Sequence, residues 1–345
     1  MSNSQEKILP TVSIVIPTYK RAQDIERLLN SLVSEITGGI EVIVVDDASP
    51  DPRIFDSVKE LFPNTLFIHS SVNQGPGRSR NLGAQKANSD IILFLDSDTT
   101  LCKGSILALK SFFAENPKYE VLCGWDDLIP LNSGFFARFK AIFQVSVAPT
   151  CGQEVSFVAG RCFAIKRQLM ISSAGFDTVY KSAEVEDYEF GRRLVSQGNS
   201  IWFLPEMRVQ HDYPSFYNQA VLYFKRVVLW MELQPNSEGA FDNSLGTRRR
   251  DALITIFSAI FPWTFISLNW LWPSFFPILI SITAITLNAK FLKMCYKEEG
   301  LWFLIKAIFC HSFLSLVICI GGAHSLITKP VWKKLKLMYY PTPKG

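Results

Sequence analysis

The chain has 345 residues but lacks closely paired cysteines and an apolar N-terminal leader. Its seven cysteines include no CxxC pair and no even, close-spaced framework, which favours buried thiols in a reducing compartment over a disulfide-stapled secreted domain. The first ten residues are polar and lack the apolar core of a secretory signal. We therefore expect the domain that follows to stay in the cytoplasm.

Acidic residues are scarce in the last part of the chain, where residues 251–345 carry nine lysines and three acidic residues. The first 250 residues hold 26 basic and 28 acidic residues, so no strongly basic domain is present and nucleic acid is not an expected partner. Charge is missing altogether from Ala252–Asn288, and Ala307–Ala323 carries only His311 as an ionisable group. About 20 apolar residues suffice to span a bilayer, so we expect an integral protein of the cytoplasmic membrane.

The number of spans stays open, because Ala252–Asn288 is compatible with one kinked segment or with two spans that turn near residues 269–273. Three arginines, Arg248–Arg250, mark the cytoplasmic side of the first span under the positive-inside rule. Two earlier segments, Tyr217–Met231 and Phe135–Phe143, combine aromatic and basic residues, and each is interpreted equally well as an interfacial helix or as core packing.

From Thr11 onward the pattern alternates between short apolar runs and amphipathic helices. Val12–Ile16, Ile40–Val45, Asn64–His69 and Ile91–Leu95 are predicted strands, with helices over 22–34 and 77–88. Such alternation predicts an α/β fold with a doubly wound, mostly parallel sheet. Ligands bind beyond the carboxyl ends of the strands in these sheets, so we expect the chemistry there.

Polar residues follow three of these strands directly: Pro17-Thr18-Tyr19, Asp46-Asp47 and Asp96-Ser97-Asp98. Two carboxylates that leave a strand end one residue apart can hold a hard divalent cation, which then bridges phosphate oxygens. A DxD triplet is a weak signal by itself, since such triplets are common at strand ends. Asp46 and Asp47 could bind a base or ribose hydroxyls, or could cap a turn.

Two further segments carry candidate chemistry. Asn73–Gly83 is a glycine-rich turn that opens a helix, and its amides and arginines suit a diphosphate, although it matches neither GxxxxGK[ST] nor GxGxxG. Glu184–Glu189 holds four carboxylates in six residues. These could be an acidic helix start favoured by the helix dipole, or could include a general base whose neighbours raise its pKa.

These segments, taken in order, resemble glycosyltransferase family 2. The resemblance covers about residues 11–215 and rests on Val12–Tyr19, Val44–Ser49, the Asn73–Gly83 turn, Phe94–Asp98 and the Glu186-Asp187 pair. It implies a GT-A fold and an inverting transfer from a nucleotide-diphospho-sugar donor, dependent on Mg²⁺ or Mn²⁺. Asp187, paired with Glu186, is implied as the base that deprotonates the acceptor hydroxyl.

The other implied roles follow from the same motifs. The loop Gly175-Phe176-Asp177 matches the acceptor side, and the metal ligands would be Asp98, Asp96 and His211, although a lone histidine is more often structural. The donor-binding set implied by the resemblance is Pro17, Thr18, Tyr19, Asp46, Asp47, Asn73, Gly75, Arg80 and Asp96. The C-terminal part also resembles membrane-anchored members of the family.

The predicted organisation is a polar tail (1–10), a catalytic domain (11–215), an amphipathic helix and linker (216–250), a transmembrane region with two or three spans (251–328) and a basic tail (329–345). The Q/RxxRW signature of processive synthases is missing, which favours transfer of single sugars over polymer synthesis. We expect a membrane-presented acceptor, such as a lipid-linked saccharide, and a role in cell-surface glycan assembly. The alternatives are a polyprenyl-phosphate sugar synthase, an inactive membrane scaffold and, least well matched, a nucleotidyltransferase.

Overall fold

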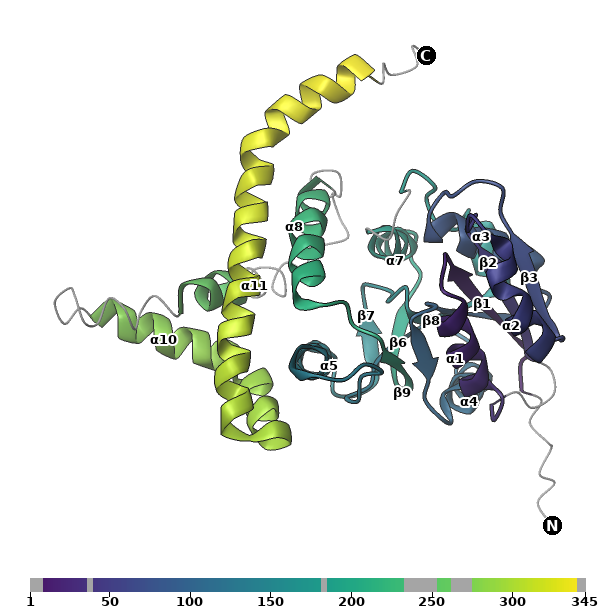
Figure 1. The fold of residues 1–345 in the computed structure, drawn as a ribbon, viewed down its shortest axis with the longest axis horizontal. Helices are drawn as coiled ribbons and strands as arrows, with labels where there is room; N and C mark the ends of the chain where they lie inside the picture. The colour runs from purple at the N-terminus through teal and green to yellow at the C-terminus, as the bar shows by residue number, and fades with distance from the viewer. Residues whose placement is uncertain (1–8, 36–39, 181–184, 233–252, 262–274, 340–345) are drawn as a thin grey trace. The chain divides into compact units, whose positions relative to one another are not determined.

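The computed structural model describes residues 9–35, 40–180, 185–232, 253–261 and 275–339 (Figure 1). The chain divides into two compact units, Met1–Tyr213 and Pro214–Gly345. The first unit holds all the motifs that follow the predicted strands. Part of the predicted transmembrane region, the linker after residue 232 and the end of the basic tail lie outside the described residues.

The described part of the first unit is built on a nine-stranded sheet with the order β3-β2-β1-β4-β8-β6-β9-β5, and β7 pairs with β9. The strands are β1 Val12–Thr18, β2 Ile40–Asp46, β3 Thr65–His69, β4 Ile91–Leu95, β5 Thr99–Leu101, β6 Val121–Asp126, β7 Gln153–Val155, β8 Cys162–Lys166 and β9 Ile201–His211. Neighbours among β3, β2, β1 and β4 are parallel, as predicted. Beyond β4 the sheet is mixed, because β8 runs antiparallel to both β4 and β6.

Helices cover both faces of this sheet. The helical elements of this unit are α1 Ala22–Leu32, η1 Pro52–Phe55, α2 Asp56–Leu61, α3 Pro76–Lys86, α4 Ser105–Glu115, α5 Phe135–Val147, α6 Arg167–Ser172 and α7 Glu186–Ser196. In β1, Ile14 and Ile16 pack in one core with α1 and α4, while Val15 packs in the other with α3 and α7. Successive strand residues point to opposite faces, so a strand buried along its whole length, such as β1, contributes to both cores.

Gly83 lets α3 approach the sheet closely. A Cβ at this position would lie 2.3 Å from Val15 Cγ1 and 3.3 Å from Val45 Cγ2. We expect Gly83→Ala to destabilise the protein by about 1–3 kcal/mol, because overpacking forces the helix away from β1 and β2. Thermal unfolding of the detergent-solubilised chain measures this, with Gln85→Ala on the exposed side of α3 as the control. An unchanged melting temperature for Gly83→Ala would contradict this close packing.

The second unit contains α8 Phe216–Glu232, a helical stretch over 253–261, α10 Phe275–Leu287 and α11 Ala289–Tyr339. Gly300 interrupts α11 with φ 83° and ψ −175°, a conformation that glycine adopts without a steric penalty. Within the described residues, Ala289–Thr328 is the one helical segment long and apolar enough to cross a membrane, and its most apolar 18-residue stretch has a mean hydropathy of 2.2. Length and composition alone make it a candidate span.

The two predicted interfacial segments both form helices. Tyr217–Met231 lies within α8, and Phe135–Phe143 lies within α5. In α5 the side chains of Phe139 and Ile142 are buried. Core packing therefore explains why these two positions of α5 are apolar.

Candidate active site

The loops that follow β1 and β2 have strained backbones at the predicted donor side. Lys20 and Ala48 adopt positive φ values of 59° and 63°, which are uncommon for residues with a side chain. The Lys20 amide donates to Ser49 Oγ at 2.8 Å and so ties the two loops together. Thr18, at the end of β1, is buried, whereas the Tyr19 ring is exposed. Such strain is found preferentially at functional sites.

Asp46 and Asp47 hold their own loops in place. Asp46 accepts hydrogen bonds from the Ser49 amide and hydroxyl with one oxygen, and its other oxygen lies 2.7 Å from His69 Nδ1. Asp47 accepts from the backbone amides of Gln74 (3.0 Å) and Gly75 (2.7 Å), one with each oxygen. The turn-capping alternative is therefore observed for both aspartates. Contact of Asp47 with a nucleobase, and the donor roles of Pro17, Tyr19 and Asn73, stay predictions.

Arg80 connects the strand end of β4 with the start of α7. Its side chain is 2% exposed, and it donates from Nη2 to Asp96 Oδ1 at 2.6 Å and from Nη1 to Glu186 Oε1 at 3.0 Å. Burial opposes its charge, but Asp96 and Glu186 outweigh burial and raise the pKa of Arg80 further. Burial and the neighbouring charge of Asp187 raise the pKa of Glu186 in spite of this ion pair. Arg80 thus joins a donor-side motif to the predicted base.

Asp187 lies beside this ion pair, in the first turn of α7. Its Oδ2 accepts from the Gly160 amide at 2.9 Å. A Cβ on Gly160 would lie 3.0 Å from Arg80 Nη2 and 3.1 Å from Asp187 Oδ2, so a side chain here would crowd these two charged groups. The predicted base is therefore held by a main-chain donor next to Arg80.

The predicted acceptor-side loop is fastened to α3 by Asn81. The Asn81 amide donates to the Phe176 carbonyl and its oxygen accepts from the Phe176 amide, both at 2.8 Å. Gly175 has φ 65° and sits directly against Asn81. Phe176 itself is buried among Phe94, Phe163 and Phe190, so its ring belongs to the core, and the acceptor-side role of the loop stays a prediction. Acceptor roles for Gly175 and Asp177 stay predictions.

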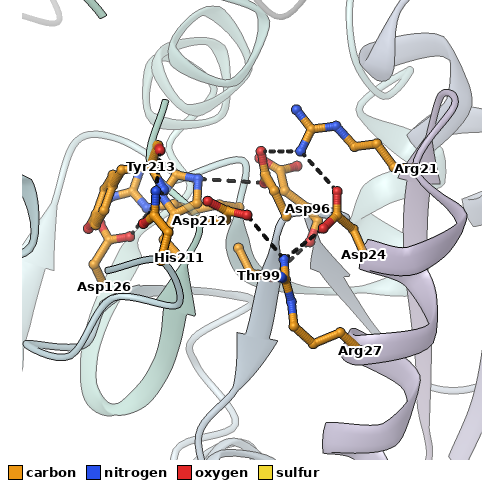
Figure 2. Close-up of polar contacts among 12 residues, drawn as sticks. Arg21, Asp24, Arg27, Asp96, Thr99, Asp126, His211, Asp212 and Tyr213 are labelled. Carbon is orange, nitrogen blue, oxygen red and sulfur yellow. Dashed lines mark hydrogen bonds and ion pairs between the residues drawn. The ribbon is translucent and has the colours of Figure 1, made fainter. Parts of the chain in front are cut away.

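Asp98 and His211 meet because β5 pairs with β9, which sets Thr99 opposite His211. His211 Nε2 lies 3.5 Å from Asp98 Oδ1, and Arg21 Nη1 donates to Asp98 Oδ2 at 3.0 Å. Figure 2 shows Arg21 and Arg27 reaching from the α1 side toward this group of acidic residues. Burial opposes ionisation of Asp98, but His211 and Arg21 outweigh it and lower the pKa of this carboxyl.

A second carboxylate, Asp126 at the end of β6, lies on the other side of His211 (Figure 2). Asp126 Oδ1 is 3.3 Å from His211 Nδ1, and Asp126 Oδ2 forms an ion pair with Arg161 Nη2. Burial raises the pKa of Asp126, whereas the neighbouring Arg161 and His211 lower it. The lowering is larger, and the pKa of Asp126 is about 2. Burial likewise opposes the imidazolium of His211, but the adjacent carboxylates of Asp126 and Asp98 raise its pKa to about 9.

The predicted three-residue metal set comes together only in part. Asp96 turns to Arg80, and the described residues contain no cluster of three His, Cys, Asp or Glu side chains arranged to hold a metal ion. Asp98 and His211 still provide one hard oxygen donor and one imidazole, and their side chains are 23% and 18% exposed. Two protein ligands fit Mg²⁺ or Mn²⁺, since these ions commonly take their remaining ligands from water and substrate phosphates.

Sequence reasoning missed Asp126, Arg161, Arg21 and the backbone amide of Gly160. Asp126 did carry a signal, because it ends the apolar run Val121–Trp125 in the way that Asp46 and Asp96 end theirs. Arg161 carried none, since its partner lies 35 positions earlier in the chain. Only the pairing of β6, β8 and β9 brings these residues together.

Part of the chain matches a known protein family. The family model described as Glycosyl transferase family 2 matches residues 13–172, which contain the strand-end motifs, Arg80 and the DxD triplet. Residues 13–172 are a glycosyltransferase family 2 domain. This match favours an enzyme over the scaffold alternative.

Individual relatives of this glycosyltransferase are distant. An uncharacterized glycosyltransferase of Haemophilus influenzae is 28% identical over 187 residues, which cover 54% of this chain and 62% of the relative. The minor teichoic acid biosynthesis protein GgaA of Bacillus subtilis is 33% identical over 111 residues, covering 30% of this chain and 25% of the relative. The chain thus spans less than two thirds of the length of these curated relatives.

A solved structure shows the same fold. The mannosyltransferase PcManGT from Pyrobaculum calidifontis, in complex with GDP-Man and Mn²⁺, superposes with a TM-score of 0.58 at 16% identity, covering 92% of this chain and 88% of that one. This similarity establishes the GT-A fold for this chain.

Proposed function

We propose that this glycosyltransferase moves a single sugar, with inversion, from a nucleotide-diphospho-sugar to a membrane-presented acceptor, and that it needs Mg²⁺ or Mn²⁺. The observation that carries the proposal is the Arg80 bridge. One buried guanidinium holds Asp96 of the DxD triplet and Glu186 next to the predicted base Asp187. Donor-side and acceptor-side carboxylates are thereby fixed within one site, as a single displacement requires.

The chemical step follows from these groups. An acceptor hydroxyl oxygen attacks the anomeric carbon, the bond between that carbon and the diphosphate oxygen breaks, and the hydroxyl proton passes to the Asp187 carboxylate. The nucleoside diphosphate leaves with the electron pair of the broken bond. The Gly160 amide donates to Asp187 Oδ2 and the Tyr188 amide donates to Oδ1, so two main-chain donors orient the carboxylate that takes the proton. One displacement of this kind inverts the anomeric centre without a covalent intermediate.

Negative charge grows on the leaving diphosphate in this step, and Asp98 with His211 would hold the divalent cation that neutralises it. Asp98 and His211 are positioned by the β5–β9 pairing before any ligand arrives. Arg21, which donates to Asp98, keeps this carboxylate in place. Arg80 keeps Asp96 and Glu186 from repelling each other.

Three observations support a membrane-presented acceptor and a catalytic domain on the cytoplasmic side. Ala289–Thr328 has the length and hydropathy of a membrane span. Arg248–Arg250 precede the apolar part of the chain, in the position that the positive-inside rule assigns to the cytoplasm. The relative GgaA carries a name from teichoic acid biosynthesis, which agrees with a role in cell-surface glycan assembly.

Donor hydrolysis by the detergent-solubilised chain tests the proposal. We expect slow release of nucleoside diphosphate from one member of a panel of UDP-, GDP- and dTDP-sugars with Mn²⁺ or Mg²⁺. EDTA should abolish the release, and Asp98→Ala should lower it about 10²-fold or more, because the stabilisation of the leaving charge is lost. Asp56→Ala on the surface of α2 is the control and should behave like the wild type.

Turnover that persists in EDTA would contradict the metal requirement, and turnover of no donor would contradict donor use by this site. The linkage formed with membrane lipid extracts separates the proposed function from its close alternative. An acid-labile sugar phosphodiester would identify a polyprenyl-phosphate sugar synthase. A glycosidic product that survives mild acid supports transfer to a saccharide.

A further inference from the structure

His69, the last residue of β3, lies at the same edge of the sheet as the donor-side motifs. Its register partner on β2 is Asp46, and the register partner of Asp46 on β1 is Thr18. Residues in register on parallel strands point to the same face of the sheet, and neighbouring strands lie about 4.8 Å apart. The row formed by Thr18, Asp46 and His69 is therefore roughly 10 Å long, comparable to the length of a nucleoside.

The two ends of this row offer hydrogen-bonding groups that its middle does not. The side chain of Asp46 is 5% exposed, and its oxygens contact Ser49 and His69. The side chain of His69 is 43% exposed. At the other end, Thr18 Oγ1 is buried and has no hydrogen-bond partner among the residues that the structure describes. A buried hydroxyl without a partner is costly, so a polar ligand that supplies one would bind favourably along this row.

The contact with Asp46 sets the roles of the two nitrogens of His69. Nδ1 lies 2.7 Å from Asp46 Oδ2, while Asp46 Oδ1 accepts from the Ser49 amide and hydroxyl. A carboxylate used in this way only accepts, so Nδ1 of His69 donates and the lone pair of Nε2 is left as an acceptor. Asp47, by contrast, is 6% exposed and accepts a backbone amide with each oxygen. His69 is therefore the accessible acceptor among these three side chains.

We infer that His69 is a specificity-determining residue for the donor: its Nε2 accepts a hydrogen bond from the ring N–H that uracil, thymine and guanine carry next to a carbonyl group. Cytosine and adenine lack this hydrogen, because their corresponding ring nitrogen is itself an acceptor. Asp46 holds the imidazole in place through Nδ1. The inference rests on the nucleotide-diphospho-sugar donor proposed above, and it names the group that recognises the base of that donor.

Calorimetric titration of the detergent-solubilised full chain with nucleoside diphosphates and Mn²⁺ tests the inference. The ligands are used in pairs, UDP with CDP, dTDP with dCDP and GDP with ADP, because the first member of each pair carries the ring N–H and the second does not. The pair that contains the nucleotide of the preferred donor decides. We expect the wild type to bind the first member about 3–10-fold more tightly, the usual effect of one hydrogen bond at a half-exposed position.

The variant His69→Asn separates recognition of the base from support of Asp46. The asparagine amide nitrogen is bonded to Cγ, as histidine Nδ1 is, so it can still donate to Asp46, but no acceptor remains where Nε2 lies. We expect the preference within the pair to disappear, while the affinity for inorganic pyrophosphate with Mn²⁺, which involves no base, stays unchanged. Leu66→Asn places the same side chain at an exposed position on the other face of β3 and should keep the wild-type preference.

Equal affinity of the wild type for both members of the pair would overturn the inference without any variant. A preference that survives in His69→Asn would also overturn it and assign recognition of the base to another acceptor, such as Asp47. If His69→Asn does not fold, His69→Gln replaces it: its amide offers either an oxygen or an NH₂ to the base, so the preference should again disappear. If the wild type binds no nucleoside diphosphate in Mn²⁺, the proposed donor fails and the inference fails with it. Binding whose base preference does not depend on His69 overturns the inference alone.

Discussion

Replacing Asp187 with asparagine is expected to lower the rate of sugar transfer by about 10²–10⁴-fold, the usual contribution of a positioned general base. The asparagine has nearly the same shape, and its oxygen can still accept from the Gly160 amide, as Asp187 Oδ2 does at 2.9 Å. The loop that carries Gly160 should therefore keep its position. What is lost is the group that receives the acceptor proton.

The measurement is the transfer rate together with donor affinity, obtained from calorimetric titration with the donor identified in the panel. Asp187→Asn should leave the donor Kd within about threefold of the wild type, because the donor-side loops of β1 and β2 are untouched. Glu189→Gln is the matched control. It removes one charge from the same helical turn, but Glu189 pairs with Arg193 at 2.7 Å. Full transfer activity in Asp187→Asn would exclude Asp187 as the base.

Replacing Arg80 with leucine is expected to cost about 3–5 kcal/mol in the free energy of unfolding, because it leaves carboxylates without their buried partner. The guanidinium is 2% exposed and contacts Asp96 at 2.6 Å and Glu186 at 3.0 Å, so water cannot easily replace it. We expect the melting temperature of the solubilised chain to fall by about 10 °C and transfer activity to disappear.

Arg80→Lys separates charge from geometry. Lysine keeps a cation in the site, but one ammonium group cannot reproduce the planar fork whose two nitrogens reach Asp96 and Glu186. Its stability should lie between those of wild type and Arg80→Leu, with a transfer rate well below wild type. Arg78→Leu, on an exposed position of the same helix, should change stability by less than about 0.5 kcal/mol. A wild-type melting temperature for Arg80→Leu would show that the bridge does not hold the site together.

Much of the first half of the fold could be predicted because its signals are local. A strand buried on both faces must be apolar throughout, so β1 and β4 stand out as runs of five or more apolar or β-branched residues. Such strands end where polar residues begin, and in parallel neighbours these ends share one edge of the sheet. The order of residues along the chain was therefore enough to place the DxD triplet and the Asp46-Asp47 pair at a common site.

The second half of the sheet could not be predicted in the same way. Strands β5 and β7 have three residues each, too few to show a period, and β5 pairs with a strand more than 100 positions later. The predicted acceptor-side loop contains Phe176, whose ring the structure buries among other aromatic rings, which no local pattern indicated. Its neighbour Gly175 has the positive φ that the turn requires.

The sequence by itself determined the alternating α/β order, the apolar C-terminal part and the chemical types at the strand ends, because each depends on residues adjacent in the chain. Tertiary structure alone decided which charges meet. Arg80 could have bound a phosphate, but it lies buried between Asp96 and Glu186. His211 could have been an ordinary core histidine, but the β5–β9 and β6–β9 pairings set it between Asp98 and Asp126. Which charged side chains meet in this way depends on the register between strands. Register brings together residues far apart in the chain, so no local sequence pattern reveals these pairs.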